Sequence, residues 1–156
     1  MNVPINPYAS PSTPPYPSDQ LDDRGPVIPA GQGARFANLI IDYLAQFAIS
    51  FVFGVVVVVI GGEQGADFLD KTPGLLIGIP ILLSYYFVLE ATTSRTLGKL
   101  VTGTKVVNQD GRTPTLGQIV GRTLCRLIPF EPLSFLGTPT RGWHDSIPKT
   151  FVVRSR

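Results

Sequence analysis

Residues 43–60 read YLAQFAISFVFGVVVVVI, and this uncharged run of eighteen residues decides the fold. About 20 residues of α-helix, at ~1.5 Å per residue, cross a hydrocarbon layer of ~30 Å. Backbone groups in lipid have to form hydrogen bonds within their own segment, so a run of this length predicts a transmembrane helix and not a buried strand. Residues 36–42, which precede this run, mix apolar and polar side chains, and with them the predicted span covers residues 36–60.

A second span is predicted over residues 72–91, where Ser84 and the two tyrosines interrupt an otherwise apolar run and Tyr85, Tyr86 and Glu90 mark the far end. The sequence GGEQGADFLDKTPG, residues 61–74, is expected to turn the chain between the two spans. The sequence therefore predicts an α-helical integral membrane protein with two transmembrane helices.

The third apolar region, residues 115–136, carries Arg122 and Arg126 and is broken by two prolines. Each arginine near the centre of a span costs ~2.5–3.5 kcal/mol on insertion scales. We therefore expect an interfacial amphipathic helix here, with its arginines at lipid head groups or at an acidic partner. A third transmembrane span over residues 116–136 is the alternative.

The chain ends differ from this apolar centre. Residues 1–33 hold eight of the fifteen prolines and predict a disordered cytoplasmic tail, which leaves residues 34–156 as one membrane domain. Ten of the thirteen Lys and Arg residues follow Glu90. Because positive loops remain in the cytoplasm, both termini are expected on that side of a bacterial-type cytoplasmic (inner) membrane.

A small cytoplasmic β element is also predicted. GTKVVNQDGRTP, residues 103–114, is typical of a strand, a turn at Asp110 and Gly111, and a short return strand. KTFVVR, residues 149–154, predicts one more strand. These strands are expected to pair.

The informative charges lie at the edge of the first span. Arg35 and Asp42 are seven residues apart, so they share a helix face at a separation of about 10 Å and each needs a partner from elsewhere. A charge at the bilayer edge is costly unless it faces protein or water. The candidate partners are Asp145, which follows His144, and the two arginines of the amphipathic segment.

Several motifs in order resemble the RDD family of membrane proteins: ARFANLIID (34–42), TSRTLGKLVTGTKVVNQDGRTPT (93–115), GRTLCRLIPF (121–130) and HDSIPKTFVV (144–153). The family is named for one arginine and two aspartates, and the resemblance assigns these to Arg35, Asp42 and Asp145. For a few members it also implies a proposed role in sodium/proton exchange.

Two functions are therefore carried forward. The first is a non-enzymatic membrane protein whose Arg–Asp network organises the helices for assembly or partner binding. The second is a cation (Na⁺)/proton antiporter that acts as a homo-oligomer. The expected partners are the lipid bilayer, its anionic lipids, further copies of the chain or another membrane protein, and no nucleic acid.

Catalytic and cofactor motifs are missing from the sequence. TLGK, at residues 96–99, lacks the earlier glycine and the following Ser or Thr of a phosphate loop, so Gly98 is expected to turn the chain back beneath the membrane and Lys99 to lie near anionic lipid. A single histidine cannot build a zinc site. We expect no metal, no cofactor and no enzymatic activity.

Overall fold

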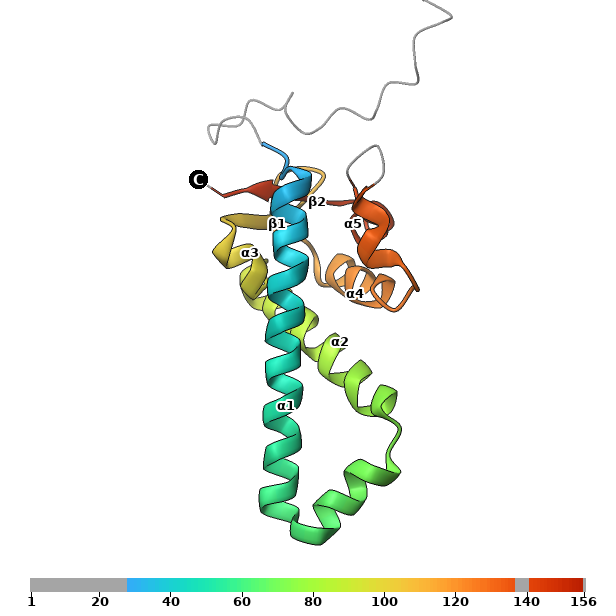
Figure 1. Cartoon of the computed structure of the whole chain (residues 1–156). Helices are drawn as coiled ribbons and strands as arrows, with labels where there is room; N and C mark the ends of the chain where they lie inside the picture. Colours follow the sequence, from blue (N-terminus) through green and yellow to red (C-terminus); the bar gives the residue numbers. More distant parts are fainter. Residues whose placement is uncertain (1–27, 137–140, 156) are drawn as a thin grey trace, which may run out of the picture.

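The computed structural model describes residues 28–136 and 141–155, so most of the predicted tail, residues 1–27, lies outside the described part of the chain. Two long helices, α1 (Gln32–Lys71) and α2 (Gly74–Thr93), form a hairpin. The remaining elements gather at one end of this hairpin, where the described chain also begins and ends, and we call them the head (Figure 1). The fold is mostly helical.

The hairpin turn differs from the expected one. α1 includes a sharp reversal at Gly62, whose φ of 53° and ψ of −133° are strained for a residue with a Cβ, and helix resumes up to Lys71. The turn predicted over residues 61–74 therefore contains about two turns of helix, which Figure 1 shows at the far end of the hairpin. The predicted span 36–60 falls within α1, and the predicted span 72–91 overlaps α2 except for Thr72 and Pro73, which precede this helix. Both helices are long and apolar enough to cross a membrane.

The first two helices after α2 are α3 and α4. α3 (Leu97–Val101) begins at Thr96, whose hydroxyl accepts a hydrogen bond from the Lys99 amide. α4 (Leu116–Cys125) begins with a capping box, in which the side chains of Thr115 and Gln118 each bond to the other residue's backbone N–H. Its ten residues extend only ~15 Å, too short to cross a bilayer. Among the described residues, α1 and α2 are the two candidate spans.

A short 3-10 helix, η2 (Glu131–Leu136), and α5 (Trp143–Ser146) complete the helical part of the head. The sheet consists of β1 (Thr104–Asn108) and β2 (Thr150–Arg154), which pair antiparallel with Val106 opposite Val152. The predicted return strand after Gly111 is not formed, because the edge of β1 pairs with β2 from the end of the chain.

Residues 28–33 were assigned to the tail, but they belong to the folded part. The Ala30 amide donates to the carbonyl of Val152, and the Arg154 amide donates to the carbonyl of Ile28, both at 2.9 Å. These bonds add residues 28–30 to the other edge of β2, and α1 begins directly afterwards at Gln32. The chain therefore enters its first long helix from the sheet of the head.

Burial in α1 is the reverse of that in a water-soluble helix. Its buried residues are Arg35, Asn38, Asp42, Gln46 and Gly65, whereas the large apolar side chains between Phe47 and Ile60 are exposed. In the described part of the chain, a compact apolar cluster forms in the sheet, where Val107, Phe151 and Val153 pack together. The interior of the described molecule where helices and head meet is therefore polar and charged.

Candidate functional site

A buried carboxylate joins the first helix to the head. Asp145 of α5 has no exposed surface, and its Oδ2 accepts a hydrogen bond from Arg35 Nη1 at 2.5 Å. Its Oδ1 accepts from Nη1 of Arg122, which also donates to the Thr150 hydroxyl. Burial alone would raise the pKa of the Asp145 carboxyl, but the charges of Arg122 and Arg35 hold this pKa well below its usual range. Asp145 is therefore an anion between two guanidinium groups.

A second carboxylate, Glu90, joins α2 to the head. Arg122 binds it with a forked contact, Nε to Oε2 at 2.7 Å and Nη2 to Oε1 at 3.3 Å. Lys99 Nζ donates to Oε1 at 3.0 Å, and Arg126 Nη2 donates to the same oxygen at 3.2 Å. The guanidinium of Arg126 also lies 3.7 Å from the ring centroid of Tyr86. Three cations from α3 and α4 thus converge on the end of α2.

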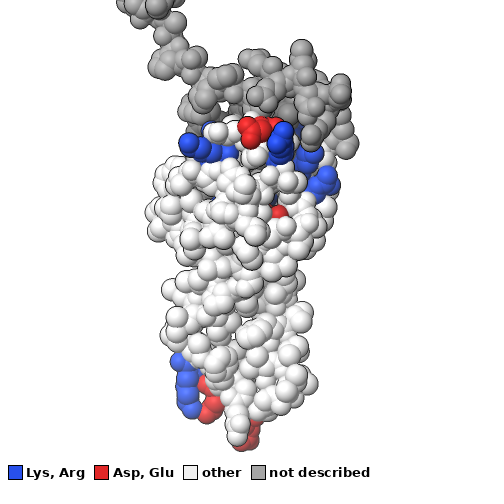
Figure 2. Space-filling view, turned by 180° about the vertical axis from the view of Figure 1, so that it is seen from behind, with Lys and Arg blue, Asp and Glu red and all other residues white. Residues whose placement is uncertain are grey.

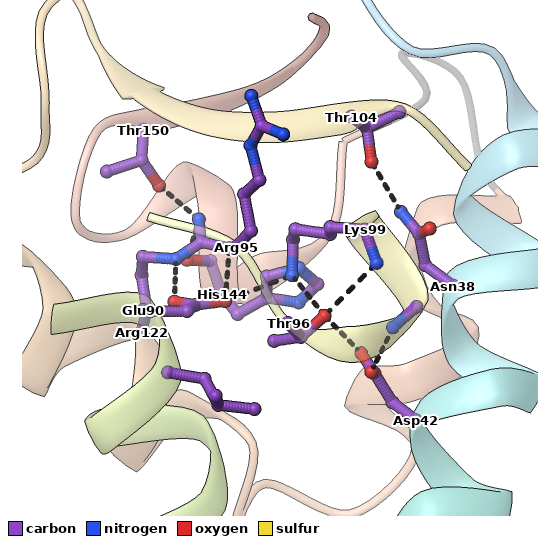
Figure 3. A network of polar contacts seen from close by, with 12 residues as sticks. Asn38, Asp42, Glu90, Arg95, Thr96, Lys99, Thr104, Arg122, His144 and Thr150 are labelled. Atoms are coloured by element: carbon purple, nitrogen blue, oxygen red, sulfur yellow. Dashed lines mark hydrogen bonds and ion pairs between the residues drawn. The ribbon is translucent and has the colours of Figure 1, made fainter. Parts of the chain in front are cut away.

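Figure 3 shows how these contacts continue towards α1. From Thr150 they pass through Arg122 and Glu90 to Lys99, and then through the Thr96 hydroxyl to Asp42. Burial lowers the pKa of the Lys99 ammonium more than the Glu90 carboxylate raises it. The path connects α1, α2, α3 and α4 with the start of β2.

Among the described residues, Asp42 has neutral hydrogen-bond donors around it and forms no ion pair. Its Oδ1 accepts from the Tyr85 hydroxyl at 2.7 Å and the Gly98 amide at 2.8 Å, and its Oδ2 accepts from the Thr96 hydroxyl at 2.7 Å. Asp42 is buried, with 2% of its surface exposed. Asp42 therefore binds the start of α3 to α1 and α2.

Gly98 allows this close approach. A Cβ built on Gly98 would lie 2.8 Å from the Cα of Asn38, which real Cβ atoms do not tolerate. One turn before Asp42, the amide of Asn38 contacts the hydroxyl of Thr104 at 3.1 Å. The glycine thus brings the backbone of α3 against that of α1.

A third carboxylate, Glu131, faces His144. Its Oε1 contacts the ring Nδ1 of His144 and lies 3.3 Å from the His144 amide. A carboxylate only accepts hydrogen bonds, so we assign the ring proton to Nδ1. Burial lowers the pKa of His144 below 6.5 more than Asp145 and Glu131 raise it, so the ring is neutral at pH 7. Burial would raise the pKa of Glu131, but the hydrogen bond from His144 and the charge of Arg126 lower it.

We call this set the charge cluster. It holds four cations and four carboxylates, with neutral His144 between two of the carboxylates: Arg35, Lys99, Arg122, Arg126, Asp42, Glu90, Glu131 and Asp145. The formal charges cancel. A buried charge is tolerated when paired and hydrogen-bonded, and here nearly every charge has a partner from another element.

The structure brings together every residue that the sequence singled out. Arg35, Arg122 and Asp145 are in direct contact, whereas Asp42 pairs with none of the predicted arginines and contacts Gly98 instead. Lys99, which was expected near lipid, is 3% exposed and bonds Glu90. Glu90 and Glu131 were missed as partners, although an acidic partner was one of the two alternatives expected for Arg122 and Arg126.

No metal or cofactor site is evident in residues 28–136 and 141–155, where no three His, Cys, Asp or Glu side chains form a group that could hold a metal ion. Cys125 is a buried free thiol on α4. Within that part of the chain, the chemistry of the site is the pairing and hydrogen bonding of buried charges.

Comparisons with known proteins support the resemblance seen in the sequence. The profile of the RDD family matches residues 29–149. An uncharacterized protein of Bacillus subtilis (strain 168), YxaI, is 33% identical over 148 residues, an alignment that covers 80% of this chain and 97% of the relative. No solved structure matches the chain. The matched range includes the whole charge cluster, and the family prediction is confirmed.

Proposed function

The chain belongs to the RDD family, and from this premise we propose that it is an integral membrane protein in which the charge cluster fixes a two-helix anchor to a cytoplasmic head. The proposed role is non-enzymatic: the anchored head would serve in assembly or in binding a partner at the membrane surface. One observation carries the proposal, namely that polar residues are buried at the junction while apolar residues face outward along the hairpin.

The outer surface of the hairpin supports insertion in a bilayer. Residues 43–62 and 72–89 contain no charged side chain. Figure 2 shows Lys, Arg, Asp and Glu at the two ends of the molecule, with a broad band between them that carries none on that face. Twenty residues of helix extend ~30 Å, the thickness of the hydrocarbon layer. A water-exposed band of this size would promote aggregation, whereas lipid covers it at no cost.

α4 supports a position of the head at the membrane interface. It buries Ile119, Arg122 and Thr123 and exposes an apolar face on the opposite side, formed by Leu116, Val120, Leu124 and Leu127. Exposed leucines beside a buried arginine fit a helix whose outer side meets lipid. The expected interfacial helix is therefore retained in the proposal, with its arginine directed to Glu90 and not to head groups.

The charge of the head favours anionic lipid and the cytoplasmic side. Asp110 is the exposed carboxylate of the described head, whereas its exposed or half-buried basic residues include Arg95, Lys105, Arg112, Lys149 and Arg154. The hairpin end carries Glu63, Asp67 and Asp70 beside Lys71. This asymmetry agrees with a head in the cytoplasm, next to the anionic inner leaflet.

Thiol labelling tests the topology in whole cells. In a Cys125→Ser background, a cysteine at Gln64 should react with an impermeant maleimide from outside, and a cysteine at Asp110 should react only after the membrane is opened. The opposite pattern would refute the orientation. Equal, rapid labelling of both positions in a soluble fraction would refute membrane insertion.

Sodium/proton exchange by a homo-oligomer is the alternative. It would need Asp42 to release its protein donors and bind a cation, although both its oxygens are already occupied by Tyr85, Gly98 and Thr96. Proteoliposomes that contain the full chain and a pH dye separate the two functions. We expect no proton movement on addition of Na⁺, and a sodium-dependent signal that Asp42→Asn abolishes would favour the exchanger.

A further inference from the structure

A small cavity lies inside the charge cluster, where helices and head meet. Its volume is about 40 Å³, and α1 contributes Arg35, Asn38, Leu39 and Asp42 to its wall. The rest of the wall comes from α2, through Tyr86, and from the head, through Lys99, Arg126, Glu131, His144 and Val152. A water molecule needs roughly 10–15 Å³ of such space, so the cavity has room for about two or three.

Two residues of the wall, Glu131 and Arg126, each carry a buried polar atom that is unpaired within the described residues. Glu131 Oε2 is an acceptor and Arg126 Nε is a donor, and within the described residues neither atom has a hydrogen-bond partner. Both atoms are fully enclosed, and the Glu131 residue is only 1% exposed. Their other atoms are engaged, Glu131 Oε1 with His144 and Arg126 Nη2 with Glu90. An unpaired charged group in the interior is costly, so each atom calls for a ligand.

The wall charges limit what this ligand can be. A sodium or ammonium ion at Glu131 would also lie beside the cations Arg35, Lys99 and Arg126. A chloride at Arg126 would face the carboxylates of Asp42 and Glu131. The whole cluster is already neutral, so an added ion would be an uncompensated buried charge. A neutral molecule that both donates and accepts hydrogen bonds satisfies the two atoms together.

We propose that this cavity is a water-binding site, in which ordered water donates to Glu131 Oε2 and accepts from Arg126 Nε. The water is a structural part of the cluster and links the 3-10 helix η2 to α4, two elements that Glu131 and Arg126 do not connect directly. Asp42 lies in the same wall but needs no water, because its three protein donors occupy both oxygens. The site does not depend on the direction in which the hairpin crosses a membrane.

Water-edited solid-state NMR of the ¹⁵N-labelled full chain in liposomes tests this site. Magnetisation that starts on water should reach the Nε–H of Arg126 several-fold faster than that of Arg122. Arg122 is the internal control, because its Nε is equally buried but donates to Glu90 at 2.7 Å. Arg126→Lys identifies the Arg126 signal. Equal slow build-up at the two positions would overturn the proposal.

A cavity-filling variant supplies an independent measurement. Val152 lines the cavity, and Val152→Ile adds a methyl group to its wall. If water occupies the cavity, this variant should slow the transfer to Arg126 to the rate of Arg122 and leave Arg122 unchanged. Fast transfer that survives the substitution would place the water elsewhere and overturn the assignment.

Discussion

Replacement of Asp145 by Asn should destabilise the protein strongly, because the substitution keeps the shape of the side chain and removes the charge between Arg35 and Arg122. Both guanidinium groups contact this carboxylate, and none of the three side chains is more than 7% exposed. The loss of one partner from a buried pair costs ~3–5 kcal/mol, since the opposite charge stays buried without compensation. We expect a loss of this size in the free energy of unfolding.

The measurement is unfolding of the full chain in mixed micelles by SDS titration, followed by fluorescence. Trp143 is the single tryptophan of the sequence and lies in α5 with Asp145, so its emission reports on this junction. Asp67→Asn is the matched control. The Asp67–Lys71 pair has the same nitrogen–oxygen separation of 2.5 Å as Arg35–Asp145, but its side chains are 67% and 73% exposed. An exposed pair contributes only ~0–1 kcal/mol.

This explanation is refuted if Asp145→Asn lowers the free energy of unfolding by no more than Asp67→Asn does. If Asp145→Asn does not fold, the milder Arg35→Lys variant keeps a positive charge and should still lose more stability than the exposed control. In a double-mutant cycle, Arg35→Met and Asp145→Asn together should cost less than the sum of the single changes, with a coupling of ~0.5–3 kcal/mol, because the double variant leaves no stranded charge on Arg35.

Three further outcomes are expected. Gly98→Ala should lower the free energy of unfolding by ~1–3 kcal/mol, because the added Cβ would clash with the backbone of Asn38. The control Gly117→Ala on α4 meets open space and should be neutral or slightly stabilising. Equal effects of the two substitutions in the same SDS titration would exclude a close approach at Gly98. Burial depresses the pKa of His144 below 6.5, so between the two pKa values the unfolded state binds a proton and the folded state does not. The free energy of unfolding should therefore be constant just above pH 6.5 and decrease as the pH falls below 6.5. His144→Gln should remove this decrease from a series of unfolding measurements at different pH, and an unchanged pH profile would contradict the assignment. Thr115→Ala should cost ~0.5–2 kcal/mol through loss of the capping box, visible as a lower thermal midpoint by circular dichroism, and an unchanged midpoint would mean that the cap does not limit stability.

The long helices could be predicted from the sequence because their signal is local. Eighteen uncharged residues predict a helix by length alone, and the helix over residues 36–60 lies within α1 as expected. The reversal at Gly62 was harder to predict, because two adjacent glycines indicate a turn but do not show that helix resumes after it. An amphipathic helix was predicted within residues 115–136, and α4 (Leu116–Cys125) occupies the first part of this range.

Pairing across the chain was harder to predict. The Asp110–Gly111 turn indicated a hairpin, yet β1 pairs with β2, whose residues come more than forty positions later. Glu90 was interpreted as the end of a span, and nothing local to it shows that Lys99, Arg122 and Arg126 converge on it. The requirement for a partner can be deduced from the cost of a buried charge, but the identity of that partner depends on the fold.

The separation of Arg35 from Asp145 also bears on how the protein is made. The two residues are 110 positions apart, and synthesis proceeds at ~5–20 residues per second, so about 5–20 s pass between the appearance of the arginine and that of its partner. In the proposed membrane topology, α1 would enter the bilayer during this interval, with Arg35 held at its edge by water and lipid head groups. Asp42 can meet its partners earlier, because Tyr85, Thr96 and Gly98 are synthesised well before Asp145. The Arg35–Asp145 pair therefore forms only after the contacts of Asp42 have become possible, once α5 has been made.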